Sequence, residues 1–241
     1  FPRIRSMTQE DVHFIDKSAE SEVGSPVGSA VSVPTLSEPG LLVMDVDSTL
    51  IDEEVIDELG VVAGCGEEIA GVTARAMRGE LEFCDALRAR VALLEGLPIS
   101  VFDTVHDKLH FTKGALELID TLHEHGWKIG VVSGGFHEVV DMLAAEGHID
   151  YWIANDGCLT GKVLGEIVSK TVKLHALQTW ADRLGIPMSQ TVAVGDGAND
   201  IPMIQAAGLG LAFCAKPKTQ LAADKAINDR DLTHVLDYLR R

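Results

Sequence analysis

The sequence predicts an α/β protein with a doubly wound parallel sheet and a small α-helical cap inserted after the first strand. Short apolar runs alternate with segments of helical spacing, which is typical of parallel sheets. One long block, residues 52–111, interrupts this alternation and shows helical spacing only. We therefore expect an α/β core at residues 40–51 and 112–241, a cap at 52–111 and a tail or linker at 1–39.

The expected tail contains a stretch, residues 18–39, that is rich in Ser, Pro, Gly and Val and lacks helical periodicity. This composition favours a linker or an extended tail. An arm that packs on a partner subunit, in a possible homodimer, is the alternative. The first residues contain no apolar h-region, so we expect no secretory signal.

Five short apolar runs are expected to form the buried strands of the sheet: residues 41–46, 127–132, 151–154, 191–196 and 209–213. In such sheets the ligand binds at the carboxyl ends of the strands. Asp45, Ser133 and Asp196 each fall at or just past such an end. We expect these side chains to converge on one rim and form a site.

The expected cap has apolar residues at helical spacing in several segments, and Gly64, Gly66, Gly79 and Pro98 punctuate them. It contains no clear strand. A helical block inserted directly after the first strand is expected to cover the end of that strand.

Composition restricts the function classes. The 241 residues carry a net charge of −17, which disfavours nucleic acid and anionic membranes as general partners. No apolar run reaches the ~18 residues of a membrane span. The four cysteines form no CxxC pair, which argues against a zinc site and a disulfide framework and favours a cytoplasmic protein. Such an acidic chain binds a phosphate ester only through concentrated local positive charge, such as a metal.

The segment Asp45-Val46-Asp47-Ser48-Thr49 places two carboxylates two residues apart at a strand end. One can attack phosphorus as a nucleophile, and the other can donate a proton if burial raises its pKa. A calcium loop of the EF-hand type is excluded, because Leu50 and Ile56 occupy the positions that need Gly and Glu. A loop of solvated acids remains the alternative.

A second acidic segment, Gly195-Asp196-Gly197-Ala198-Asn199-Asp200, follows another apolar run. Asp196 and Asp45 could hold one Mg²⁺, with Asp200 in support. The structural interpretation is a turn into a helix that Asn199 or Asp200 caps, and it does not compete with metal binding. Ser133-Gly134-Gly135 precedes a helix and could form a phosphate-binding nest, although such turns are common.

Taken together, these segments resemble the haloacid dehalogenase superfamily of phosphotransferases, and most closely its phosphoserine phosphatases. The resemblance covers about residues 41–240. It is carried by the segments MDVDSTLIDEEVIDEL, ALRARVALLEGLP, VVSGGF, DGCLTGKVLGEIVSKTVK and VAVGDGANDIPMIQAAGLGLAFCAKP.

The resemblance implies a Mg²⁺-dependent hydrolysis of phosphoserine, or of another small phosphomonoester, through an aspartyl-phosphate. Asp45 would be the nucleophile and a metal ligand, and Asp47 the general acid/base with its carbonyl on the metal. Asp196 would complete the metal site, with Asn199 and Asp200 in support. The remaining roles would be phosphoryl binding by Ser133 and Gly134, charge neutralisation by Lys173, and substrate contacts from the cap residues Glu54, Met77, Phe83 and Arg90.

Spacing alone predicts surface positions for Lys173, Arg90 and Glu54. Two alternatives remain open: phosphoryl transfer to an alcohol, and a non-catalytic phosphate-binding regulatory module on the same fold. Many family members carry a regulatory domain before the first strand, and residues 1–40 are too short for the usual one, so we do not expect feedback control of that kind.

Overall fold

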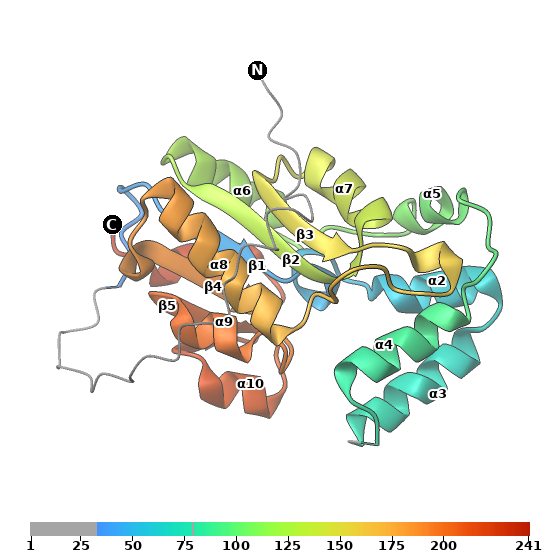
Figure 1. The fold of residues 1–241 in the computed structure, drawn as a ribbon. Helices are drawn as coiled ribbons and strands as arrows, with labels where there is room; N and C mark the ends of the chain where they lie inside the picture. The colour runs from blue at the N-terminus through green and yellow to red at the C-terminus, as the bar shows by residue number, and fades with distance from the viewer. Residues whose placement is uncertain (1–32, 79) are drawn as a thin grey trace.

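The computed structural model describes residues 33–78 and 80–241, with Met77 described by its backbone alone. Its centre is one sheet of six parallel strands in the order β3-β2-β1-β4-β5-β6 (Figure 1). Val43 of β1 is paired with Gly130 of β2 on one side and with Ala193 of β4 on the other. The strands are β1 Leu41–Met44, β2 Lys128–Phe136, β3 Tyr151–Asn155, β4 Thr191–Gly195, β5 Leu209–Phe213 and β6 Lys225–Ile227.

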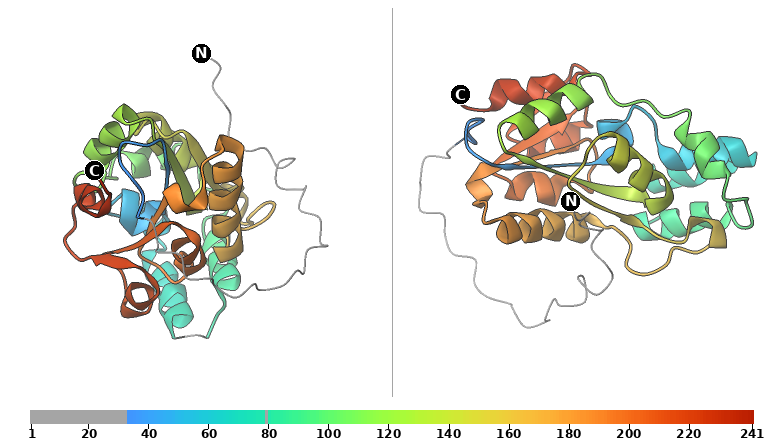
Figure 2. Two further views of the ribbon diagram at one scale, coloured as in Figure 1. Left: turned by 90° about the vertical axis from the view of Figure 1, so that its left-hand side faces the viewer. Right: turned by 90° about the horizontal axis from the view of Figure 1, so that it is seen from above.

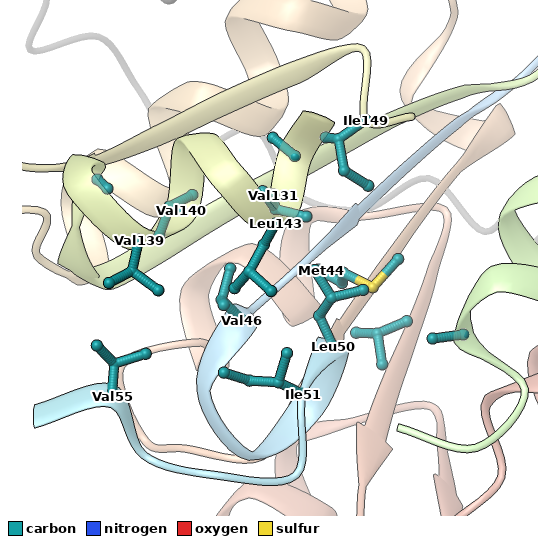
Figure 3. Packing of buried hydrophobic residues seen from close by; sticks show 14 of the residues in the cluster. Met44, Val46, Leu50, Ile51, Val55, Val131, Val139, Val140, Leu143 and Ile149 are labelled. Atoms are coloured by element: carbon teal, nitrogen blue, oxygen red, sulfur yellow. The ribbon is translucent and has the colours of Figure 1, made fainter. Parts of the chain in front are cut away.

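Helices cover both faces of the sheet, as the continuous apolar strands require. One face carries α6 (Ala115–Glu124), α7 (His137–Glu146) and the 3-10 helix η4 (Leu232–Tyr238), and the other carries α8 (Lys170–Leu184), α9 (Ile201–Ala206) and α10 (Pro217–Ala222) (Figure 2). Alternate residues of β1 therefore enter different cores. Leu42 and Met44 join the larger core with α6 and α7, part of which Figure 3 shows around Met44. Leu41 and Val43 pack toward α8 on the other face.

Close packing against α8 requires a glycine in β2. A Cβ on Gly130 would lie 2.5 Å from the indole of Trp180, a side chain that is itself 1 % exposed. In the core between the sheet and α8, the Trp180 ring therefore packs directly against the backbone of β2.

Four helices fill the segment between β1 and α6: α2 (Val55–Ala63), α3 (Gly66–Met77), α4 (Phe83–Ala92) and α5 (Val101–His106). α2 packs on α3 and α5, α3 packs on α4, and α5 contacts α7 of the core. The two connections to the core meet at an antiparallel bridge between Ile51 and Phe111. Arg230, from the loop after β6, donates to the Asp52 carboxylate and to the Ile51 carbonyl beside this bridge.

Within residues 33–39, which the sequence groups with the tail, Pro34 and Thr35 are buried against the core and Leu36 is half-buried. Thr35 forms a parallel bridge with Arg240, and the Gln190 amide donates to the Thr35 carbonyl at 2.6 Å and accepts from its N–H at 2.9 Å. The indole of Trp127 donates to the Leu36 carbonyl. The packed chain therefore begins several residues before the expected boundary at residue 40. Residues 1–32, the rest of the expected tail, lie outside the described residues.

Apart from shifts of one or two residues at the ends of β1, β3 and β4, two strands differ from expectation. β2 continues to Phe136, with an irregularity in its pairing to β3 between Val132 and Phe136. The edge strand β6 is three residues long and was not predicted, because so short a segment carries no periodicity. Three short irregular turns complete the described chain: η1 (Val46–Leu50), η2 (Cys158–Thr160) and η3 (Met188–Gln190). Within the described ranges, no helix combines the length and the apolar character needed to cross a membrane.

Candidate active site

The candidate site lies at the carboxyl ends of β1 and β4, the two central strands. The chain passes outward from β1 through β2 to β3, and outward from β4 through β5 to β6. The β1/β4 junction is therefore a topological switch point, where open α/β sheets bind ligands. Asp45 follows β1 and Asp196 follows β4, so the predicted convergence of these two carboxylates is confirmed.

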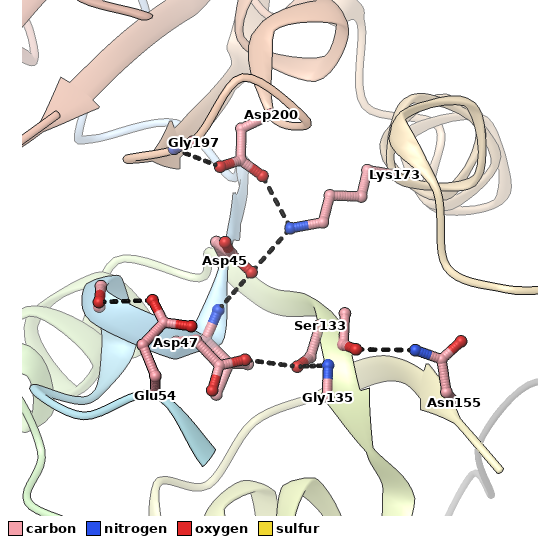
Figure 4. Close-up of polar contacts among 12 residues, drawn as sticks. Asp45, Asp47, Glu54, Ser133, Gly135, Asn155, Lys173, Gly197 and Asp200 are labelled. Carbon is pink, nitrogen blue, oxygen red and sulfur yellow. Dashed lines mark hydrogen bonds and ion pairs between the residues drawn. The ribbon is translucent and has the colours of Figure 1, made fainter. Parts of the chain in front are cut away.

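Lys173 links two acidic side chains beneath this rim (Figure 4). Its Nζ lies 2.7 Å from Asp45 Oδ1 and 2.7 Å from Asp200 Oδ1. Lys173 and Asp200 are fully buried, and Asp45 is 5 % exposed. Burial opposes the charge on Lys173, but Asp200 and Asp45 outweigh it and raise the pKa of the ammonium, which keeps Lys173 charged. The surface position that spacing predicts for Lys173 is therefore wrong.

The carboxylate of Asp45 is held at one oxygen and open at the other. Oδ1 accepts from the Val46 N–H at 2.8 Å and from Lys173, whereas Oδ2 has no hydrogen-bond partner in the described chain. Burial, and then the charge of Asp200, raise the pKa of Asp45 well above its usual value, although Lys173 opposes the rise. Asp45 is thus a fixed carboxylate with one free oxygen on the cavity.

Asp47 lies on the irregular turn η1, beside Ser48, whose φ of 56° is left-handed. Its Oδ1 accepts from the Val55 N–H at 2.8 Å, and its Oδ2 accepts from the Ser133 hydroxyl at 3.3 Å. Burial raises the pKa of Asp47, although these hydrogen bonds oppose the rise. This meets the condition for a carboxyl group that exchanges a proton.

Asp45, Asp196 and Asp200 form a cluster in which one carboxylate oxygen from each residue lies within 4.8 Å of one from each of the other two. Burial, and then the charge of Asp200, raise the pKa of Asp196 to about 6. Hard oxygen ligands crowded in this way suit a hard divalent cation, which would remove their mutual repulsion. The donor set therefore fits a metal site.

Glycine lets Asp200 reach this cluster. A Cβ on Gly195 would lie about 2.6 Å from the Asp200 side chain. The Asp200 carboxylate accepts from the Gly197 N–H at 3.0 Å and from Lys173, and it makes no capping bond to α9. Asp200 stands at the N-cap position of α9, as the capping interpretation expects, but its carboxylate makes no capping bond because Lys173 and Gly197 occupy its oxygens.

A cavity of about 220 Å³ opens above these carboxylates, between the core and the helical segment. The core side contributes Asp45, Asp47, Gly134, Gly135, Asp196, Gly197, Ala198, Asn199 and Lys216. Glu54, Ile56, Phe83, Leu87 and Arg90 form the opposite wall. Phe83 reaches across: a Cβ on Gly134 would lie 3.3 Å from its Cζ. The side chain of Met77, expected in this wall, lies outside what the structure describes.

Glu54 and Arg90 both line the cavity; Glu54 is exposed, as spacing predicts, whereas Arg90 is half-buried, so the surface position predicted for Arg90 is wrong. Glu54 accepts from the Ser48 hydroxyl at 2.8 Å; desolvation of its carboxylate in the cavity, and then the charge of Asp47, raise its pKa to about 7. Arg90 makes only long bonds, to the Ala86 carbonyl at 3.4 Å and the Thr73 hydroxyl at 3.5 Å. No carboxylate within the described ranges forms an ion pair with Arg90, so its guanidinium can receive an anion.

Ser133 differs from Gly134 in its placement. Its side chain is fully buried within β2, donates to Asp47 and accepts from the Gly135 N–H at 2.8 Å, whereas Gly134 and Gly135 line the cavity. The Asn155 amide donates to the Gly134 carbonyl at 2.8 Å. Sequence reasoning missed Asn155, although its place directly after the predicted strand 151–154 marks it as a residue at the rim.

Lys216 is a second residue that sequence reasoning missed. It precedes α10, lines the cavity with Asn199, and its charge opposes the rise in pKa that burial and Asp200 cause at Asp196. The signal was a lysine three residues past the predicted strand 209–213, at the same edge of the sheet.

Comparison with known proteins agrees with this geometry. Residues 42–205 match the family model of haloacid dehalogenase-like hydrolases. A phosphoserine phosphatase of Streptococcus thermophilus is 58% identical over 205 residues, which cover 83% of this chain and 95% of the relative. That of Lactococcus lactis subsp. lactis is 53% identical over 85% of this chain and 97% of the relative.

Two solved structures support the same assignment. The structure of a phospho-aspartyl intermediate analogue of phosphoserine phosphatase has a TM-score of 0.78 and 43% identity, and covers 84% of this chain and 100% of its own. A substrate-bound phosphoserine phosphatase complex has a TM-score of 0.78 and 42% identity, with 84% and 99% covered. With the sheet, the acidic rim and the family match in agreement, the chain belongs to the haloacid dehalogenase-like hydrolases.

Proposed function

We propose that this protein is a Mg²⁺-dependent phosphoserine phosphatase that works through an aspartyl-phosphate on Asp45. The observation that carries the proposal is the open carboxylate oxygen of Asp45, held beside buried Lys173 in a cavity whose opposite wall presents Arg90 and Glu54. The relatives named above as phosphoserine phosphatases support the substrate.

In the first step, Asp45 attacks phosphorus and the bond from phosphorus to the serine oxygen breaks. Asp47 gives its proton to that departing oxygen, as its raised pKa allows. The Gly134 and Gly135 backbone lines the place where the phosphoryl group must sit, and Asn155 fixes the Gly134 carbonyl. Ser133 then acts by orienting Asp47 and the Gly135 N–H.

In the second step, Asp47 takes a proton from a water molecule whose oxygen attacks phosphorus, which releases phosphate and restores Asp45. Throughout, Lys173 offsets the repulsion between the Asp45 carboxylate and the phosphoryl oxygens. Asp45, Asp196 and the Asp47 carbonyl would hold Mg²⁺, with Asp200 and Asn199 in support. When bound, the ion supplies positive charge to the transferring phosphoryl group.

Residues of the helical cap would bind the two charged groups of the serine moiety, its carboxylate and its ammonium. Arg90 can grip the substrate carboxylate with two parallel donors. Glu54 can accept from the ammonium, which would offset the burial that raises its pKa. Phe83 and the undescribed side chain of Met77 would exclude water from the closed site.

The setting of the enzyme is also a proposal. The four cysteines are unpaired, which supports a reducing cytoplasm. The net charge of −17 supports a small phosphomonoester as the partner, without nucleic acid or membrane. We propose the boundaries 40–51 and 112–241 for the catalytic core, extended by residues 33–39, and 52–111 for the cap. A homodimer remains a proposal that the sedimentation behaviour of the protein would test.

The first experiment is a panel of phosphomonoesters assayed for phosphate release with Mg²⁺, with Ca²⁺ and with EDTA. We expect phosphoserine to be preferred, EDTA to stop turnover, and Ca²⁺ to replace Mg²⁺ poorly because its larger shell loosens the in-line geometry. Asp45→Asn should abolish turnover with the fold intact by circular dichroism. Near-normal turnover in Asp45→Asn would end the covalent mechanism.

The second experiment tests the carboxylate contact with a substrate-by-variant cycle. Phosphoethanolamine lacks the carboxylate, and a charged hydrogen bond contributes about 1.5–3 kcal/mol, so kcat/KM should fall at least about tenfold. In Arg90→Ala this gap should nearly vanish; the matched control is Arg88→Ala on the exposed side of the same helix, where the gap should persist. A full phosphoserine advantage without Arg90 would refute its role.

A further inference from the structure

A second hollow, of about 540 Å³, adjoins the candidate active site. It lies between α3 and α4 on one side and the first turns of α8 and α10 on the other, elements that face each other in Figure 1. Phe83, Arg90, Ala198, Asn199 and Lys216 line both cavities. The larger hollow therefore borders the site along these five residues.

This groove has a charge opposite to that of the protein. Lys170, Lys216 and Lys218 line it together with Arg90, and Glu82 is its single carboxylate. The three lysines are exposed, and within the described ranges none of them forms an ion pair. Elsewhere the chain is strongly acidic, with 37 Asp and Glu against 20 Lys and Arg. Three lysines without an ion pair in one groove therefore favour the binding of an anionic ligand.

The arrangement along the groove has a direction. Lys170 and Lys218 line only the outer hollow, whereas Lys216 lines both the hollow and the inner cavity. The Debye length is about 8 Å at physiological salt, so the diffuse negative charge of distant surfaces is largely screened while these local charges act. Low-dielectric walls on two sides also concentrate the field of lysines in a groove.

We propose that Lys170, Lys216 and Lys218 form a cationic entrance that attracts the phosphate dianion of the substrate and delivers it to the Asp45 cavity past Lys216. This inference rests on the proposed function for its ligand, a small phosphate ester. The lysines act before chemistry, so they affect capture of the ester and leave the phosphoryl-transfer step to the residues at the sheet edge.

The test compares two variants with equal charge change. One carries Lys170→Gln, Lys216→Gln and Lys218→Gln; the control carries Lys108→Gln, Lys162→Gln and Lys225→Gln, three exposed lysines outside both cavities. At low ionic strength we expect the groove variant to raise KM for phosphoserine about tenfold, and this rise in KM to disappear as the salt concentration increases. Lys216→Gln alone should raise KM for phosphoserine about threefold.

Binding of inorganic phosphate to the Mg²⁺-loaded proteins, measured by calorimetry, separates this inference from the proposed function. If phosphate binding weakens in the groove variant and not in the control, the entrance stands even where phosphoserine proves not to be the substrate. Equal KM and equal phosphate affinity in the two triple variants would overturn it. A deficit that persists unchanged at high salt would also overturn it, because direct contact would then replace long-range attraction.

Discussion

Replacing Lys173 with methionine tests whether this buried lysine holds the acidic rim together. At an effective dielectric constant of about 20, each 2.7 Å contact to Asp45 and Asp200 gives about 6 kcal/mol of gross attraction. Most of that offsets the cost of burying the charges. Breaking a buried pair nevertheless leaves uncompensated carboxylates, so Lys173→Met should lower the free energy of unfolding by about 3–5 kcal/mol at neutral pH without metal.

The loss should depend on pH and on metal. The pKa of Asp45 is already raised by burial and lowered by Lys173, so removing Lys173 raises it further. A carboxyl group with a raised folded pKa is most stabilising when protonated and becomes unfavourable as pH rises through that pKa. Urea unfolding should therefore show a deficit that grows from pH 5 to pH 8. Mg²⁺ should raise the midpoint of the variant more than that of the unchanged protein.

Lys170→Met is the matched control, because Lys170 lies one turn earlier on the same helix, is exposed and has no ion pair in the described chain. Its effect should stay within about 0.5 kcal/mol. If Lys173→Met lost less than about 1 kcal/mol, with no dependence on pH or Mg²⁺, the electrostatic account of the rim would be refuted.

Three further outcomes are expected. Asp47→Asn should lower the turnover of phosphoserine about 10²–10⁴-fold, but it should lower the turnover of a nitrophenyl phosphate much less, because a nitrophenolate leaves without a proton. Equal losses for both substrates in stopped assays would show that Asp47 has a merely structural role. Gly130→Ala should cost about 1–3 kcal/mol in urea unfolding, because the new methyl group meets Trp180, and an unchanged midpoint would disprove this overpacking. A chain of residues 33–241 should keep the specific activity and the melting temperature of the full chain, whereas a chain of residues 40–241 should keep the activity but melt at a lower temperature. Equal melting temperatures of the two chains would mean that the contacts of Thr35 and its neighbours do not stabilise the fold.

The sheet and the convergence of Asp45 with Asp196 could be predicted because both follow from local pattern. The strand at 209–213 agrees with its apolar run to the residue, and parallel strands bring their carboxyl ends to one edge. The burial of Lys173 could not be predicted from spacing, since it depends on two acids that lie 128 and 27 positions away in the chain. Only the family resemblance pointed to this residue.

Other features escaped the sequence because they depend on side chains distant along the chain. Residues 33–39 have the composition of a linker, yet the amide of Gln190, 155 positions from Thr35, pairs with their backbone. Ser133 directly follows the predicted strand 127–132, but the observed strand continues to Phe136, so its hydroxyl is directed to Asp47 rather than into the cavity. Local pattern sets which residues reach the rim, and tertiary contacts set which of their atoms are free.

The bridge between Ile51 and Phe111 has a consequence for how this enzyme can be altered. Both ends of the four-helix segment meet at one antiparallel bridge, where the Asp52 N–H donates to the His110 carbonyl and the Thr112 N–H donates to the Leu50 carbonyl, so the segment is joined to the sheet like a cassette with adjacent ends. Arg230 fastens that junction from the carboxyl-terminal side of the core through Asp52 and the Ile51 carbonyl, which a new cassette can keep. A different helical cassette, transplanted between residues 55 and 110, would leave β1, β4, their acids and the Val55 N–H bound to Asp47 in place. Selectivity could then be redesigned without rebuilding the machinery that cleaves the ester.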